Sequence, residues 1–112
     1  MTKSVQTAIP DIADMGHHAE SAAELLRALA NSFRLQILCV LWEGELSVSA
    51  LNQRIPLSQS ALSQHLAVLR EDELVNTRRE SQTIFYSVKP GPAQEIIRVL
   101  HGHFCKTLAE GK

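Results

Sequence analysis

Two short helical segments joined by a turn, and followed directly by two segments with strand-like alternation, occupy residues 47–88. The first helix follows Ser47 and ends before Pro56, because proline cannot continue a helix. The second helix is expected over residues 57–72. Two strands and a polar turn come next: Val75–Arg78, Ile84–Val88 and, between them, Arg79–Gln82. This order predicts a helix-turn-helix followed by a β-hairpin, called the wing below.

Helical apolar spacing flanks this motif on both sides. A first helix rich in small side chains is expected over residues 14–30, and a last helix after the break at Pro90–Pro92. Asn31 is a predicted N-cap for the helix between them. The inward side chains predicted for that helix are Leu35, Leu38, Cys39 and Trp42. The fold class is therefore mainly α with a two-stranded β-hairpin wing, a winged helix-turn-helix of about five helices.

Length and charge limit what this fold can do. At 112 residues the chain is predicted to form one domain over residues 13–108, after a flexible N-terminal tail over residues 1–12. The net charge of −1 means that binding to nucleic acid would need a local basic surface. No apolar run resembles a signal peptide or reaches membrane-spanning length, so we expect a cytoplasmic protein without a membrane partner.

The second helix of the motif has two unlike faces. Leu62, Leu66 and Leu69 form one stripe, and small polar side chains fill the other side of the first two turns. Recognition helices contact base edges near their N-terminus, where Gln and Ser can both donate and accept. An ordinary solvated face is the alternative, but such faces are usually rich in Glu and Lys. The DNA contacts predicted on this helix are Gln59, Ser60, Ser63, Gln64 and His65.

The charge distribution favours the same interpretation. Residues 46–70 contain no Asp or Glu, although the chain has 12 acidic residues. Carboxylates near DNA phosphates are repulsive, so a docking surface would exclude them. In the wing we predict contacts to phosphates or the minor groove, unless the arginines only support the fold, for instance by pairing with Glu71 or Asp72. The predicted wing contacts are Arg78, Arg79, Ser81 and Gln82.

Two longer stretches resemble the ArsR/SmtB family of bacterial winged-helix repressors: LRALANSFRLQILCVL and LSQSALSQHLAVLREDELVNTRRESQTIFYSV. The resemblance covers about residues 20–108. It implies a homodimer whose interface is formed by the first and last helices. It also implies that each subunit presents one reading helix to a palindromic DNA operator. Val99 and Leu100, on different sides of the last helix, agree with such an interface.

The two cysteines add a more specific resemblance. Cys39 on the second helix and Cys105 near the end of the last helix match the persulfide- and redox-responsive HlyU/BigR/SqrR branch of the family. That resemblance implies that reactive sulfur species (persulfide or polysulfide) or oxidants act as the inducer by linking the two cysteines, which releases the operator. The alternative is that each cysteine is a small buried apolar residue.

A metal-responsive repressor of the zinc type remains the alternative function. Metal-sensing relatives carry a cysteine pair near the third helix or Asp, His and Glu ligands on the last one, and neither pattern is present here. His101 and His103 diverge on a helix, whereas His17 and His18 can approach across a dimer. Four tetrahedral zinc ligands cannot be assembled from this spacing. We therefore predict solvated histidines, no metal site and no cofactor.

Enzymatic function lacks a sequence basis. A thiol oxidoreductase or hydrolase would need a Cys-x-x-Cys motif, a nucleophile elbow, a glycine-rich phosphate loop or a ligand cluster. None occurs in the sequence. A winged helix used only for protein contacts is a third possibility, but its reading helix would be expected to expose apolar residues. The sequence therefore predicts a DNA-binding repressor that is not an enzyme.

Overall fold

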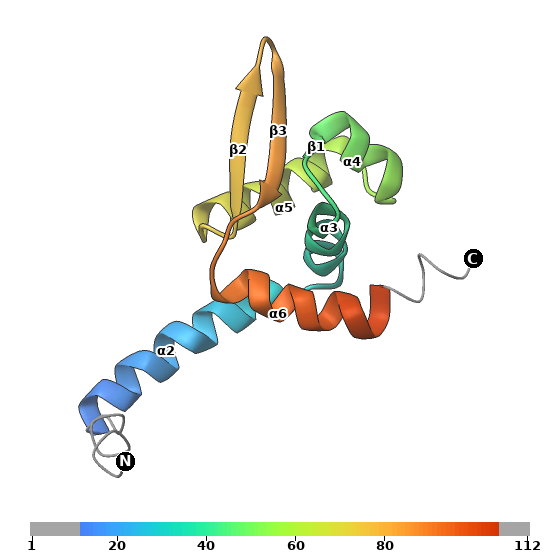
Figure 1. Cartoon of the computed structure of the whole chain (residues 1–112). Helices are drawn as coiled ribbons and strands as arrows, with labels where there is room; N and C mark the ends of the chain where they lie inside the picture. The colour runs from blue at the N-terminus through green and yellow to red at the C-terminus, as the bar shows by residue number, and fades with distance from the viewer. Residues whose placement is uncertain (1–11, 106–112) are drawn as a thin grey trace.

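Helix α3 lies at the centre of the computed structural model, which describes residues 12–105 (Figure 1). Five α-helices, a hairpin, a third short strand and a final π-helical turn make up this part of the chain. In order they are α2 Ile12–Leu29, α3 Ser32–Trp42, β1 Leu46–Ser47, α4 Val48–Arg54, α5 Gln59–Glu71, β2 Val75–Glu80, β3 Thr83–Val88, α6 Pro92–Leu100 and η1 His101–Cys105. The predicted winged helix-turn-helix is confirmed. Most of the predicted tail, and the predicted domain end at residue 108, lie outside the described residues.

Core residues contact α3 on several sides and not along a single face. The helix starts at the predicted cap, where the Asn31 side chain accepts hydrogen bonds from the Phe33 and Arg34 amides. Ile37 and Leu41 are buried, although neither was among the predicted inward residues. The predicted Leu35 and Trp42 are only half-buried, whereas Leu38 and Cys39 are buried as expected. Because other elements cover α3 on several sides, its apolar residues do not follow a single helical stripe.

The sheet contains three strands in the order β1–β3–β2. Strands β2 and β3 pair antiparallel from Val75↔Val88 to Glu80↔Thr83, which leaves a turn of only two residues, Ser81 and Gln82. The predicted turn Arg79–Gln82 was therefore two residues too long, and Arg79 lies in β2 opposite Ile84. After Val75 every β2 residue is exposed. The strand therefore has no buried face, and its sequence does not show the alternation of apolar and polar residues that would have marked its full length.

Helix α2 extends away from the other helices, and only its last turn joins the core (Figure 1). Ala28 and Leu29 are buried, while Met15 and Leu26 are exposed. At the other end of the chain the exposed apolar side chains are Val99 on α6 and Phe104 on η1.

Within the described residues, none of the helices alone is long and apolar enough to cross a membrane. Helices α2 and α3 taken together meet a test of length and composition, but the pair is bent by 87° and α3 belongs to the core.

Candidate nucleic-acid interface

Helix α5 divides into a buried stripe and an exposed polar face, as its sequence predicts. Its first turn is capped by Ser58, whose Oγ accepts a hydrogen bond of 3.1 Å from the Ala61 amide. Leu62, Leu66 and Leu69 are at most 2% exposed. The exposed side chains of its first two turns are Gln59, Ser60, Ser63 and Gln64.

The turn before α5 is held by short-range hydrogen bonds. Ser47 caps α4 by accepting from the Ala50 amide at 3.1 Å. At the other end of α4, the Asn52 side-chain amide donates to the Leu57 carbonyl oxygen at 2.8 Å. Asn52 thus connects α4 to the residue that immediately precedes the Ser58 cap. This bond fixes how α5 leaves the turn.

A cleft of about 740 Å³ lies between α4, α5 and the wing. It brings Gln59 and Ser63 of α5 to the same surface as Gln82 of the wing turn. No charged side chain lines it. The full lining is Ser47, Val48, Ser49, Asn52, Gln53, Gln59, Ser63, Gln82, Thr83, Ile84 and Tyr86. This concave polar surface can present hydrogen-bonding groups to a DNA groove.

Several cleft residues were not predicted as contacts. Ser49, Asn52 and Gln53 are contributed by α4, and Thr83 begins β3. The signal for the first three was present in the sequence, because they fall in the stretch without carboxylates. Their place in the cleft depends on the packing of α4 and the wing beside α5, which the sequence does not show.

His65 occupies a different environment from the other predicted contacts on α5. It is half-buried, and its ring centroid lies 6.1 Å from that of Phe33 on α3. The side chain therefore supports the packing of α5 on α3. Its role as a DNA contact stays a prediction.

The two wing arginines differ in their partners. Arg78 donates to both carboxylate oxygens of Glu45, from Nη2 at 2.8 Å and Nε at 2.9 Å, and from Nη1 to Glu80 at 3.2 Å. These bonds raise the pKa of the Arg78 guanidinium, and the bond from Arg78 lowers the pKa of the Glu45 carboxyl. The alternative partners Glu71 and Asp72 are not used. Arg79 is exposed and forms no ion pair within residues 12–105.

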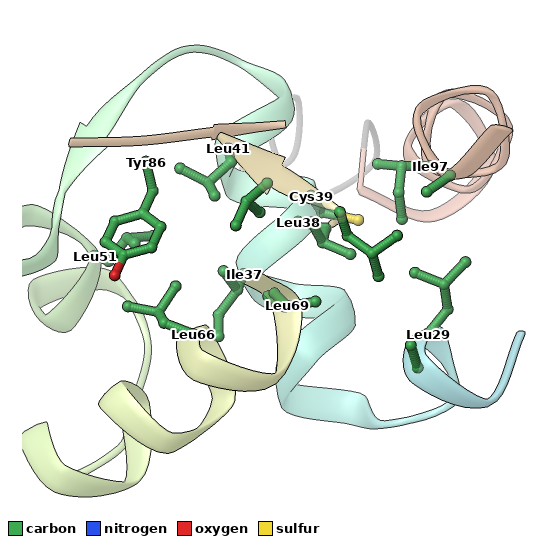
Figure 2. Packing of buried hydrophobic residues seen from close by; sticks show 14 of the residues in the cluster. Leu29, Ile37, Leu38, Cys39, Leu41, Leu51, Leu66, Leu69, Tyr86 and Ile97 are labelled. Carbon is green, nitrogen blue, oxygen red and sulfur yellow. The ribbon is translucent and has the colours of Figure 1, made fainter. Parts of the chain in front are cut away.

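Cys39 is buried, 9% exposed, and lines an apolar cavity of about 330 Å³ between α3 and the segment formed by α6 and η1. Figure 2 shows its sulfur on the side of α3 that faces Ile97 rather than Leu51 and Leu66. The other lining residues are Ser32, Leu35, Gln36, Leu100 and Phe104. Cys105 follows Phe104 in η1, but its side chain lies outside the described ones.

The described histidines are dispersed. His101 lies 3.3 Å from a Glu43 carboxylate oxygen and 6.2 Å, between ring centroids, from Trp42. His17 and His18 are exposed on α2. Among the residues that the structure describes, no three His, Cys, Asp or Glu side chains come together as metal ligands.

Comparison with known proteins gives consistent results. The model for "Bacterial regulatory protein, arsR family" matches residues 31–77. The transcriptional activator HlyU of Vibrio cholerae is 50% identical over 96 residues, which are 86% of this chain and 89% of that protein. The solved structure of reduced HlyU from the same organism superposes with a TM-score of 0.78 at 52% identity, covering 82% of this chain and 97% of that one.

The transcriptional repressor BigR of Xylella fastidiosa has the same fold. Its structure superposes with a TM-score of 0.77 at 41% identity, covering 88% of this chain and 95% of that one. The helix-turn-helix with its capped α5, the wing and the nearly full-length similarity to known regulators thus agree. The chain belongs to the ArsR family of bacterial transcriptional regulators.

Proposed function

We propose that this regulator is a homodimeric repressor that binds a palindromic operator and releases it when Cys39 and Cys105 become linked. Operator binding is supported by the capped reading helix, its exposed Ser and Gln side chains and the uncharged cleft beside the wing. Dimerisation is supported by the exposed Met15, Leu26 and Val99 on α2 and α6. Since its partner is chromosomal DNA, the protein would act in the cytoplasm.

The observation that carries the cysteine switch is the cavity beside Cys39. Its wall includes Leu100 and Phe104, and Phe104 is the residue before Cys105. The turn η1 therefore lies close to the helix that holds Cys39. A solved structure of HlyU from Vibrio cholerae is of its reduced form, which agrees with a redox response in this chain.

Linking two thiols requires a two-electron oxidant, and polysulfide can fill this role. A cysteine thiolate attacks a sulfur–sulfur bond of the polysulfide and becomes a persulfide, and a shorter polysulfide leaves as the thiolate. The second cysteine then attacks the inner sulfur of the persulfide as a thiolate. Hydrosulfide leaves with the electron pair of the broken bond. The two thiols lose two electrons, the polysulfide gains them, and one disulfide joins α3 to η1.

Such a link would act on the reading helix through α3. Ile37 of α3 lies beside Leu66 and Leu69 of α5 in the core (Figure 2). In a dimer the two reading helices must match successive major grooves, about 34 Å apart. A covalent link between α3 and η1 would shift this spacing and weaken operator binding.

Fluorescence anisotropy with a duplex covering the DNA upstream of the protein's own coding sequence tests the proposal. Reduced protein should bind, and polysulfide-treated protein should bind at least tenfold more weakly. Cys39→Ala and Cys105→Ser should each remain bound after treatment, and mass spectrometry should detect the Cys39–Cys105 link only in the parent. Circular dichroism controls for folding, because Cys39 is a core residue.

Three outcomes would contradict parts of the proposal. Release of the Cys39→Ala/Cys105→Ser double variant by polysulfide would place the sensor elsewhere. Release of the reduced parent by zinc alone would favour the metal-responsive alternative. A reporter gene that loses expression when the regulator is deleted would make it an activator, as HlyU of Vibrio cholerae is named, rather than a repressor.

A further inference from the structure

Arg78 spans the three-stranded sheet from its outer strand to the loop before β1. In the sheet register Ser47 of β1 is opposite Phe85 of β3, and Phe85 is opposite Arg78 of β2. Directly opposed residues have side chains on the same face of a sheet. The Arg78 side chain follows this row across the middle strand and reaches Glu45, two residues before Ser47.

The contacts along this row leave the guanidinium little freedom. The Arg78 Cζ atom lies 4.6 Å from the centroid of the Phe85 ring, a cation–π distance. Beyond the ring, two hydrogen bonds of 2.8 and 2.9 Å join Arg78 to both Glu45 oxygens. Bidentate arginine–carboxylate pairs fix direction as well as distance. Glu80 accepts a third bond at 3.2 Å on the wing itself.

The outer part of the wing needs such a connection. Every β2 residue after Val75 is exposed, so this strand contributes no buried side chain beyond its first residue. Isolated two-stranded ribbons are marginally stable in water. Strand β1 pairs with Tyr86 and Phe85 on the other side of β3. Strand β2 therefore lies at an edge of the sheet and, among the described strands, pairs with β3 alone. The Glu45–Arg78 pair joins β2 to the loop after α3.

We propose that Arg78 is a positioning residue: paired with Glu45 across Phe85, it holds the wing at the angle that brings Ser81 and Gln82 to DNA. This inference rests on the proposed operator binding. It replaces the predicted phosphate contact of Arg78 with a structural role, called the brace below: the Glu45–Arg78 pair that holds the wing in place. Two carboxylates balance the charge of Arg78, which disfavours a phosphate contact. Arg79, exposed and without an ion pair among the described residues, keeps the phosphate-contact role.

The effect of Glu45→Gln on DNA affinity distinguishes the brace from a direct phosphate contact by Arg78. Removing an acid near a DNA-binding surface should by charge alone strengthen binding. If Glu45 holds the wing through Arg78, Glu45→Gln should instead weaken binding, by roughly two- to fivefold given the modest strength of exposed pairs. Arg78→Lys, which keeps the charge and loses the bidentate geometry, should weaken binding similarly. Glu80→Gln is the matched control, because it removes an acid from the wing and leaves the bidentate pair.

The probe is the duplex that the reduced parent selects from a random-sequence DNA pool, and affinity is measured from low to high salt. For Glu45→Gln and Arg78→Lys we expect weaker binding with an unchanged salt slope, and for Glu80→Gln binding at least as tight as the parent's. The charge swap Glu45→Arg/Arg78→Glu should bind more tightly than Arg78→Glu alone, because the pair is restored with the opposite polarity.

Two results would overturn the brace. Tighter binding by Glu45→Gln would show that this carboxylate acts only as a repulsive charge. A charge swap that binds no better than Arg78→Glu would make Arg78 a direct phosphate contact. Failure of the reduced parent to select any duplex would instead overturn the proposed operator binding and the brace together.

Discussion

The side-chain amide of Asn52 donates a 2.8 Å hydrogen bond to the carbonyl oxygen of Leu57, across the turn that separates α4 from α5. Both residues are half-buried. If Asn52 is replaced by Ala, the Leu57 carbonyl oxygen loses this donor, and water can replace it only in part. We expect Asn52→Ala to lower the free energy of unfolding by about 1 kcal/mol. Urea denaturation measures this value. The exposed neighbour Gln53, changed to Ala, should stay within about 0.5 kcal/mol of the parent.

Ser63→Ala and Gln64→Ala test whether α5 contacts the bases of the operator. Each variant should lose roughly 1–3 kcal/mol of operator binding for each lost base contact, and preference among sequences should fall with it. The melting midpoint should stay near the parent value, because both side chains are exposed opposite the leucine stripe.

Leu66→Ala is the contrasting control for these variants. Its side chain is 2% exposed, so truncation should destabilise the fold by about 2–5 kcal/mol. If Ser63→Ala and Gln64→Ala bind the operator as tightly as the parent does, the reading helix has been assigned incorrectly.

Arg79 should contribute a phosphate contact that Arg78 does not. Arg79→Ala is expected to weaken binding to all sequences and to reduce the slope of log affinity against log salt by about one unit. Titrations at several salt concentrations measure the slope. Arg98→Ala removes the same charge from α6, on the other side of α3 from the wing, and should leave the slope unchanged (Figure 1). An unchanged slope in Arg79→Ala would remove this residue from the interface.

The Glu45–Arg78 pair should be visible in the titration of Glu45. The hydrogen bond from Arg78 lowers the pKa of this carboxyl below its ordinary value of 4.5. A depressed carboxyl pKa means that the pair stabilises the fold above the ordinary value and that this contribution is lost as pH falls through the lowered one. Carbon-detected NMR of the Glu45 carboxyl should show a higher pKa in Arg78→Gln. Equal titration in both proteins would mean that the pair does not persist in solution.

Access to Cys39 should depend on Phe104, which lines the cavity beside the thiol. Phe104→Ala is expected to increase the rate of Cys39 alkylation severalfold, because it opens the apolar wall. Alkylation by iodoacetamide, followed by peptide mass spectrometry, gives the rate for each cysteine. Val99→Ala is the control, since Val99 is an exposed apolar residue of α6 outside this cavity. Equal rates in the two variants would show that Phe104 does not control access.

Local patterns predicted the helices of this fold and much of its core. The caps Asn31, Ser47 and Ser58 each accept from amides within three residues, so the sequence around them is enough to locate them. The leucine stripe of α5 was predicted for the same reason, since one buried face imposes a helical period. These features depend on neighbours along the chain.

The features that were missed depend on distant parts of the chain. Arg78 and Glu45 are 33 residues apart in sequence and meet only because β1, β3 and β2 align in one register. The two residues of β1 are too few to show alternation. His65, predicted as a DNA contact, also packs beside Phe33 of α3, and this contact joins residues 32 positions apart in sequence. Sequence spacing does not contain this information.

The acid-free stretch from Leu46 to Arg70 also affects how such a regulator would search a chromosome. The chain carries a net charge of only −1, so beyond a Debye length of about 8 Å it is scarcely drawn to DNA. If α4, α5 and the wing form the docking face, attraction would begin mainly when this face turns toward the duplex. Non-specific encounters would therefore be brief, with little sliding along the helix. The time to find a site would be set mainly by three-dimensional diffusion and rotation, and few copies would be held on unrelated sequences.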